Sequence, residues 1–419
     1  MAIAIALVGV GSLTPVASYG YLAQQRWFET ASGYAFATGQ PITLTWSLPP
    51  DGVATSGAGV NRLVAALDGV FQVASPSQDL TTRAWFPYVQ SAIERWSEVS
   101  GVRFVYEPND DGAPVGPSNG ALAVRGDVRI AGHSLNGAGG TLALSNFPDS
   151  GDILLDTADI NFLALPGENF LRLRNVLTHE VGHAIGLGHV ESSDTNSLME
   201  PQLHLSVDGP QLDDIRGAHW MYGDANERSN GGLGNGSAAL ATSLGVLSPA
   251  TMLSVGGDAA KMGAIDASDS DFVSITNTID HDVYAFSTHS PLRAELALTP
   301  LGGTFHQGLP GGAESLTNAS ARNNLRFELI GPDGEGVLAI ANSAPAGAVE
   351  RLSIDLSTPG NYFVRVSGSF HAVQLYQLEL TATSLGDPSA PITPEPSAFT
   401  FAAIALTTAS GSLPNRCGA

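Results

Sequence analysis

Three histidines at a fixed spacing constrain this chain more than any other feature. Residues 179–189 read His-Glu-Val-Gly-His-Ala-Ile-Gly-Leu-Gly-His, so His179 and His183 lie four residues apart. On a helix this spacing places both imidazoles on one face, one turn apart, where they can bind one metal ion. Gly186 can end the helix with a positive φ, so that the chain reverses and brings His189 to the same ion. Three His ligands leave a fourth position open, which is typical of a catalytic zinc site.

Glu180 follows the first of these histidines and can face the metal without binding it. Zinc lowers the pKa of a bound water towards about 7. Glu180 would accept the proton of this water and pass it to the leaving amine of a peptide bond. The short motif HExxH arises often by chance, whereas the extended form with the glycine and the third histidine is specific.

Cysteine content and charge exclude several classes of site. Cys417 is the only cysteine, so the chain forms no intrachain disulfide and a Cys-based zinc site is not expected. The net charge is −22 and Lys261 is the only lysine, which argues against a nucleic-acid partner. Acidic loops either form a solvated surface or hold structural calcium, whose ligands are oxygens. Asp152 and Asp156 are either calcium ligands or turn residues.

Length and apolar periodicity predict two folded regions. A chain of 419 residues exceeds one ordinary core. The first region mixes strands, predicted at 42–46, 102–106 and 124–130, with helices, predicted at 86–100, 169–186 and 211–221. From about residue 270, short alternating strands separated by turns predict an all-β sandwich. These strands are predicted at 283–286, 325–330, 337–341, 352–356, 362–366 and 375–380.

The segment around the histidine motif resembles the metzincin peptidases and, within them, the matrixins. Met199 follows the motif as in the metzincin Met-turn, and Pro201 stands where astacins and serralysins carry a tyrosine ligand. Residues 212–223 also resemble the last matrixin helix. The resemblance covers about residues 40–224. It implies an α+β metzincin catalytic domain, with a twisted mixed sheet and long helices, followed here by the all-β sandwich.

This resemblance implies one catalytic zinc ion per chain, with Glu180 as the general base. The zinc ligands would be His179, His183 and His189, and the supporting residues would be Gly186, Met199 and Pro201. Protein or peptide substrates would lie extended along an edge strand near residues 140–144. A hydrophobic S1′ pocket beside the zinc would be walled by the chain after Met199.

Two matrixin features have no counterpart in the sequence. Animal matrixins hold a second, structural zinc with histidines in the loops before the motif. Leu144 and Leu154 stand at the comparable positions, so a second zinc is not expected, and His133 is interpreted as a loop or surface residue. No cysteine precedes the domain to act as a Cys switch. The other histidines, among them His204 and His219, have no ligand spacing and are interpreted as structural or surface residues.

The remaining segments predict export. Residues 1–39 are interpreted as a signal or leader region and the polar residues 225–269 as a linker. Residues 270–384 resemble the bacterial pre-peptidase C-terminal domain, which either binds a surface or polysaccharide or acts as a spacer. Residues 385–419 contain Pro-Glu-Pro at 394–396 and then an apolar run, which resembles a PEP-CTERM sorting signal. That signal implies an exosortase partner.

Together these features predict an exported, monomeric zinc endopeptidase, extracellular or at the cell surface of a Gram-negative-type bacterium. Two alternatives stay open. The first is a surface or extracellular-matrix binding protein with a silent protease domain. The second is a narrow self-processing or toxin-type enzyme that acts on one partner.

Overall fold

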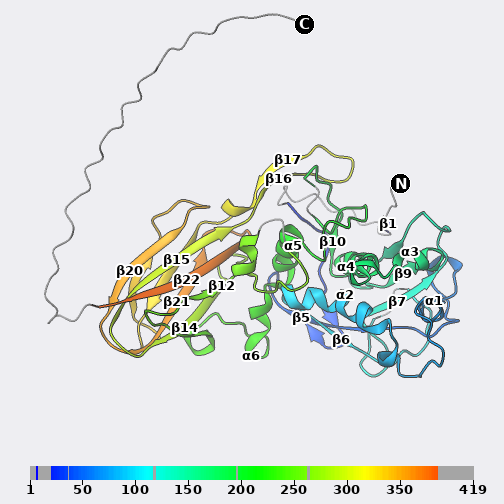
Figure 1. Cartoon of the computed structure of the whole chain (residues 1–419), viewed down its shortest axis with the longest axis horizontal. Helices are drawn as coiled ribbons and strands as arrows, with labels where there is room; N and C mark the ends of the chain where they lie inside the picture. Colours follow the sequence, from blue (N-terminus) through cyan, green and yellow to red (C-terminus); the bar gives the residue numbers. More distant parts are fainter. Residues whose placement is uncertain are drawn as a thin grey trace, which may run out of the picture. The chain divides into compact units, whose positions relative to one another are not determined.

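The computed structural model describes residues 6–7, 20–35, 37–116, 119–194, 197–261 and 265–385 (Figure 1). The predicted sorting signal at 385–419 lies almost entirely outside these residues, as does most of the first half of the predicted leader. Within the described part of the chain, no helix is long and apolar enough to span a membrane.

The region that contains the histidine motif is built on a six-stranded mixed sheet, in the order β1-β8-β9-β7-β5-β6. All neighbouring strands run parallel except β8 and β9, which are antiparallel. The strands are β1 (Ala6–Leu7), β5 (Ile42–Ser47), β6 (Val102–Tyr106), β7 (Val128–His133), β8 (Ala143–Ser145) and β9 (Ile153–Asp156). The expected α+β fold with a mixed sheet is therefore present.

Two long helices form the core with this sheet: α2 (Phe86–Val99) and α4 (Leu171–Ala184). Every third or fourth side chain of α2 is buried, from Phe86 to Trp96, and this apolar stripe explains why a helix forms here. The indole of Trp96 donates a hydrogen bond to the carbonyl oxygen of Thr178 at 2.8 Å, which fixes α2 against the motif helix. Shorter helices are α1 (Leu63–Val70) and α5 (Leu212–Tyr222).

The strand expected to bind substrate is not the edge of the sheet. β8 forms at Ala143–Ser145, within the expected neighbourhood, and pairs on one side with β9. On its other side it pairs in parallel with β1, with Ala6 opposite Leu144. Among the described residues β1 is the edge strand, because a segment far away in sequence adds to the sheet.

The segment 20–35, which we assigned to the leader, packs into the same core. Its strand β2 (Leu22–Ala23) pairs antiparallel with β10 (Leu187–Gly188), directly before His189. Trp27 is 1% exposed, and its indole donates to the carbonyl oxygen of Ala184 at 2.7 Å. This part of the segment is therefore an element of the folded region, and the boundary expected at residue 40 does not match the packing.

The second region is a β-sandwich of two five-stranded sheets (Figure 1). One sheet has the order β11-β14-β21-β18-β19, and the other contains β12-β22-β15-β20 with β13 paired to β22. The six predicted strands are present as β14 (His281–Thr288), β18 (Leu325–Ile330), β19 (Val337–Ala341), β20 (Glu350–Leu356), β21 (Gly360–Gly368) and β22 (Gln374–Ser384). β13 (Val273–Ile275), β15 (Leu292–Leu301) and the hairpin β16 (Thr304–Gln307) and β17 (Ser315–Asn318) were not predicted.

The predicted linker at 225–269 supplies strands to both sheets of the sandwich. β11 (Thr242–Val246) pairs in parallel with β14, and β12 (Leu253–Val255) pairs antiparallel with β22. The polar, glycine-rich composition of this segment is typical of a flexible linker, but the structure places it in both sheets. Backbone hydrogen bonding to the sheets holds these short segments in place without a strong apolar pattern.

Candidate metal centre

Helix α4 brings His179 and His183 to one buried point. Their Nδ1 atoms lie 2.7 Å from carbonyl oxygens, of Leu198 and Leu187 respectively. A carbonyl oxygen can only accept, so each Nδ1 carries the proton and each Nε2 presents a lone pair. The two Nε2 atoms lie 3.0 Å apart, and two lone pairs at this distance cannot form a hydrogen bond with each other.

The chain turns sharply after α4 and brings in the third histidine. Gly186 has a φ of +109°, and a Cβ at this position would lie 1.7 Å from the carbonyl oxygen of Gln25. Only glycine fits this turn. The β10–β2 pairing then positions His189, whose Nε2 lies 3.1 Å from that of His179 and 3.0 Å from that of His183.

These three nitrogens fit one zinc ion. Zinc–nitrogen bonds of about 2.0–2.1 Å in tetrahedral geometry separate the nitrogens by about 3.3 Å, close to the distances observed here. Burial lowers the pKa of His179 to about 3 and that of His189 to about 4, and it lowers the pKa of His183 well below its usual value. All three imidazoles are therefore neutral at neutral pH, as metal binding requires.

Glu180 is fully buried, and neither of its carboxylate oxygens has a hydrogen-bond partner among the described residues. Burial raises the pKa of Glu180 well above its usual value. A buried carboxylate without a partner is costly, so a structural role alone does not explain this residue. An acid–base role next to a metal-bound water would satisfy both oxygens.

Met199 packs beneath α4, the helix that carries His179 and His183. It is buried, and a Cβ added to Gly182 of α4 would lie 2.4 Å from the Met199 Sδ atom. The glycine inside the motif therefore allows this close approach. Pro201 lies in the bend after Met199 and is half-buried.

Asp214 holds the turn around Met199, a role that no motif in the sequence indicates. Its carboxylate accepts hydrogen bonds from the Ser197 hydroxyl at 2.6 Å and from the backbone N–H groups of Leu198, Met199 and Gln211 at 2.7, 3.2 and 2.9 Å. Leu198 in turn contacts His179 through its carbonyl oxygen. Asp214 is therefore linked to His179 through one intervening residue. The Gln-x-x-Asp capping box at the start of α5 is a sequence signal for Asp214, but only for the helix start.

The sandwich contacts the segment that follows His189. Glu191 and Gly308 exchange two backbone hydrogen bonds, of 3.0 and 2.9 Å, and the Ser192 hydroxyl donates to the carbonyl oxygen of His306 at 2.7 Å. Gly308 lies directly after β16. The β16–β17 hairpin therefore supports the backbone beyond the third histidine.

The remaining histidines have different surroundings. His204 lines the pocket beside His179, and its Nε2 lies 3.0 Å from Glu200 Oε2. His204 therefore lies close to the three histidines, although its position in the sequence does not match a metal-ligand spacing. The Nδ1 of His133 lies 2.9 Å from the Thr55 hydroxyl, and His219 is buried with its Nε2 2.7 Å from the Val99 carbonyl oxygen.

A second cluster of possible metal ligands lies where the segment 225–269, predicted as a linker, meets the sandwich. Carboxylate oxygens of Glu227, Asp280 and Asp282 lie within 4.8 Å of one another. Asp282 is 0% exposed, and its Oδ1 has no partner among the described residues. Asp152 and Asp156, for which calcium binding and a turn role were both left open, accept backbone N–H groups: Asp152 from Arg129 and Gly116, at 3.0 Å each, and Asp156 from Ala158 at 2.7 Å.

Residues 68–223 match the model of the matrixin family, and the chain therefore carries a matrixin domain. It is 32% identical over 159 residues to metalloendoproteinase 5-MMP of Arabidopsis thaliana, covering 34% of this chain and 40% of that protein. It is 36% identical over 107 residues to matrix metalloproteinase-25 of Mus musculus, covering 23% and 17%. The chain thus spans less than half the length of these curated relatives.

Among solved structures, the chain is similar to the pre-peptidase C-terminal domain of collagenase from Bacillus anthracis. The identity is 13%, the coverage is 34% of this chain and 94% of that one, and the TM-score is 0.20. It is also similar to PliG, a periplasmic inhibitor of g-type lysozyme from Aeromonas hydrophila, with 10% identity, coverage of 34% and 96%, and a TM-score of 0.20. At these TM-scores neither likeness assigns a fold, and the description of the sandwich rests on its strand pairing.

Proposed function

We propose that this chain is an exported zinc-dependent endopeptidase, with His179, His183 and His189 as metal ligands. The observation that carries the proposal is the convergence of the three Nε2 atoms within 3.1 Å. The matrixin match and the metalloendoproteinase relatives support the same activity.

In the proposed mechanism, His179, His183 and His189 would hold a zinc ion, which would supply an acidified water and polarise the scissile carbonyl. Glu180 would accept the proton of the attacking water, because neither of its oxygens has a hydrogen-bond partner in the part of the chain that the structure describes. The same carboxyl then donates the proton to the leaving amine. Burial raises the pKa of Glu180, and the charge of a bound cation would lower it again, so that the ionised carboxylate could accept the proton.

The activity is tested by incubating the purified full chain with casein and with a quenched generic peptide, before and after zinc is removed by a chelator. We expect cleavage that stops on zinc removal and returns on zinc addition. A zinc-loaded protein that cleaves neither casein nor any peptide of a random library would favour the silent surface-binding protein. Cleavage of only one sequence would favour the narrow self-processing or toxin-type enzyme.

The proposal includes the surroundings of the enzyme as well. The Pro-Glu-Pro triplet at 394–396 supports sorting by an exosortase of a Gram-negative-type bacterium, with the enzyme outside the cell or at its surface. The sandwich would bind a surface or an extracellular polysaccharide, and the enzyme would act as a monomer. Fractionation of the native host tests the location: activity confined to the cytoplasm would contradict export.

We further propose that calcium binds at the cluster of Glu227, Asp280 and Asp282. Three carboxylates this close repel one another, and the unpartnered Oδ1 of buried Asp282 points to a missing cation. Fully buried Asn235 supports this, because its Oδ1 also lacks a partner among the described residues and its backbone carbonyl accepts from the N–H of Val283, next to Asp282.

The pH dependence of stability tests the calcium proposal. Burial first, and then neighbouring carboxylates, raise the pKa of Glu227 to about 9, and burial raises that of nearby Asp224 to about 7. A carboxyl group with a raised folded-state pKa stabilises the fold below its unfolded pKa, and this stability is lost as pH rises through the folded pKa. Without calcium, the unfolding temperature is therefore expected to fall between pH 5 and pH 9.

Adding calcium, with zinc kept saturating, is expected to reverse this loss at high pH, because the ion stabilises the ionised carboxylates. Asp282→Asn should abolish the calcium effect, whereas Asp333→Asn in an exposed turn should preserve it. An unfolding temperature at pH 8.5 that does not respond to calcium in the unmodified chain would exclude this site.

A further inference from the structure

We propose that the pocket lined by Arg103 and Arg228 binds an acidic saccharide, that is, a sugar unit that carries a carboxylate or a sulfate group. The pocket lies beside β6, at the edge of the six-stranded sheet, and its lining includes none of the three histidines of the metal centre. The inference therefore does not rest on the proposed peptidase function. It assigns saccharide binding to the region that holds the histidine motif rather than to the sandwich.

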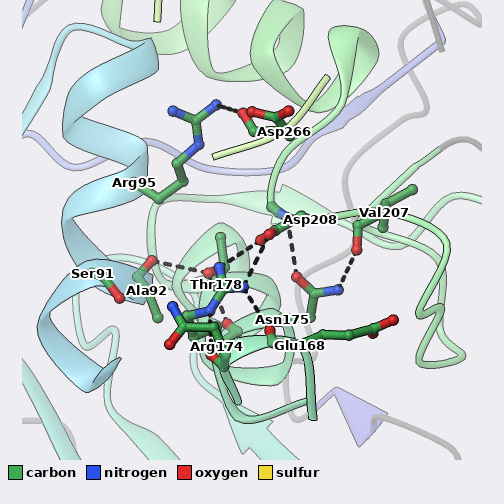
Figure 2. Close-up of polar contacts among 12 residues, drawn as sticks. Ser91, Ala92, Arg95, Glu168, Arg174, Asn175, Thr178, Val207, Asp208 and Asp266 are labelled. Carbon is green, nitrogen blue, oxygen red and sulfur yellow. Dashed lines mark hydrogen bonds and ion pairs between the residues drawn. The ribbon is translucent and has the colours of Figure 1, made fainter. Parts of the chain in front are cut away.

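Arg103 and Arg228 differ from most arginines of this chain because they lack a carboxylate partner. Most arginines in the described part of the chain form ion pairs with Asp or Glu, as Arg174 does with Asp208 (Figure 2). Neither Arg103 nor Arg228 forms such a pair with any described residue, although the chain contains 40 Asp and Glu residues. A guanidinium group keeps its charge at physiological pH. The pocket therefore holds two positive charges without a described carboxylate to neutralise them.

Arg228 is fixed at the pocket with one of its donors unpaired. Its Nη2 donates to the carbonyl oxygen of Ser97 at 2.6 Å, whereas its Nε is buried and has no hydrogen-bond partner among the described residues. Burial, and after it the charge of Arg103, lowers the pKa of Arg228, so the two guanidinium groups are close enough to repel each other. Asp224 opposes this shift, but each of its carboxylate oxygens already accepts a backbone N–H at 2.8 Å. An oxyanion between the two arginines would relieve the repulsion through charge-assisted hydrogen bonds.

The pocket is larger than a bare anion requires. Arg103 on β6 is the register partner of Thr43 on β5, so the two side chains lie on one face of the sheet. At three other lining positions, Gly33, Gly231 and Gly232, an added Cβ would meet no atom within 4 Å. These glycines leave the space open, and the pocket has a volume of about 400 Å³. A single water needs only about 10–15 Å³ on this scale, so the pocket has room for an oxyanion that is carried by a larger group.

The rest of the lining favours a sugar as this larger group. It includes the hydroxyl groups of Ser32 and Thr43, which can form hydrogen bonds with the hydroxyl groups of a sugar. It also includes Tyr34 of β4 (Gly33–Tyr34), which is 64% exposed and whose hydroxyl donates to Glu29 Oε1 at 2.9 Å. An exposed aromatic ring offers an apolar face on which the C–H groups of a sugar ring can pack. The arginines alone would also suit an acidic peptide, so the test compares the two kinds of ligand.

Binding is measured by isothermal titration calorimetry of the purified full chain with glucuronate, glucose 6-sulfate and glucose. We expect at least one of the acidic sugars to bind at least about tenfold more tightly than glucose, because its hydrogen bonds to the arginines are charge-assisted. The tighter of the two acidic sugars identifies the anion as a carboxylate or a sulfate. Arg103→Gln and Arg228→Gln should each remove this preference. Arg351→Gln is the matched control, because it removes the same charge from an exposed residue of β20 outside the pocket, and it should keep the preference.

Three results would overturn the proposal. The first is the absence of binding of either acidic sugar at millimolar concentration, and the second is equal binding of glucose. The third is binding of sodium sulfate or N-acetylglutamate as tightly as the acidic sugars, because it would assign a bare ion or an acidic peptide to the pocket.

The Arg103 variant keeps the test decisive if Arg228→Gln does not fold. Arg103 is exposed, whereas Arg228 contacts the Ser97 carbonyl oxygen, so thermal unfolding of Arg103→Gln should match that of the unmodified chain. Tighter binding of an acidic sugar that persists in folded Arg103→Gln would overturn the proposal. Calorimetry requires neither zinc nor cleavage, and Arg103→Gln should cleave peptides as the unmodified chain does. Failure of this inference is therefore distinguishable from failure of the proposed peptidase function.

Discussion

Replacing Glu180 by glutamine is expected to lower kcat/KM for peptide cleavage by about 10²–10⁴-fold, the range that a positioned acid–base group contributes. Glutamine has nearly the same shape but cannot accept a proton at neutral pH. The variant should keep one zinc per chain, because Glu180 is not needed as a ligand. The measurement is steady-state cleavage of a quenched peptide, with the zinc content determined on the same sample.

A loss of activity in Glu180→Gln supports a role as a base only if the variant still binds zinc. Loss of both zinc and activity would show that Glu180 supports the metal and would leave its role as a base without support. Activity within about tenfold of the unmodified chain would contradict the proposed mechanism, because another group would then accept the proton.

Asp214→Asn is expected to weaken zinc binding by about 10–100-fold, the usual effect of removing a group that orients a metal ligand. The carboxylate now serves four donors, and an amide turns one of its two acceptor atoms into a donor. Each buried donor left unpaired costs about 1–3 kcal/mol of stability. The measurement is a competition titration with a zinc chelator, together with thermal unfolding of the zinc-free protein.

Asp213→Asn is the matched control for Asp214. Asp213 is the neighbouring buried carboxylate, and it forms an ion pair with Arg216. This variant should lose stability without a specific loss of zinc affinity. Equal zinc affinities in the Asp214 variant and the unmodified chain would show that the turn at Met199 does not position His179.

The local part of the site could be predicted from the sequence. The spacing of His179 and His183 fixes their common face on a helix, and Gly186 is found at the turn because glycine alone fits there. The strands at 325–330 and 337–341 were predicted with the bounds that the structure has, because the first alternates apolar and charged residues and turn residues separate the two.

The remaining features depend on contacts that are distant in sequence. Asp214 acts through backbone groups of another segment, and backbone partners leave no pattern in the sequence. Trp27 lies in a segment that resembled a leader, and its burial depends on Ala184, which is far along the chain. β11 and β12 have linker composition, and their pairing depends on the sandwich that they join.

The most direct test of the central claim is X-ray absorption at the zinc edge of the purified full chain, with the zinc content measured on the same sample. We predict one zinc per chain with three nitrogen ligands at about 2.0–2.1 Å and one oxygen, and loss of this signal in His183→Ala. A protein without zinc, or a zinc whose ligands are unchanged in His183→Ala, would contradict the account.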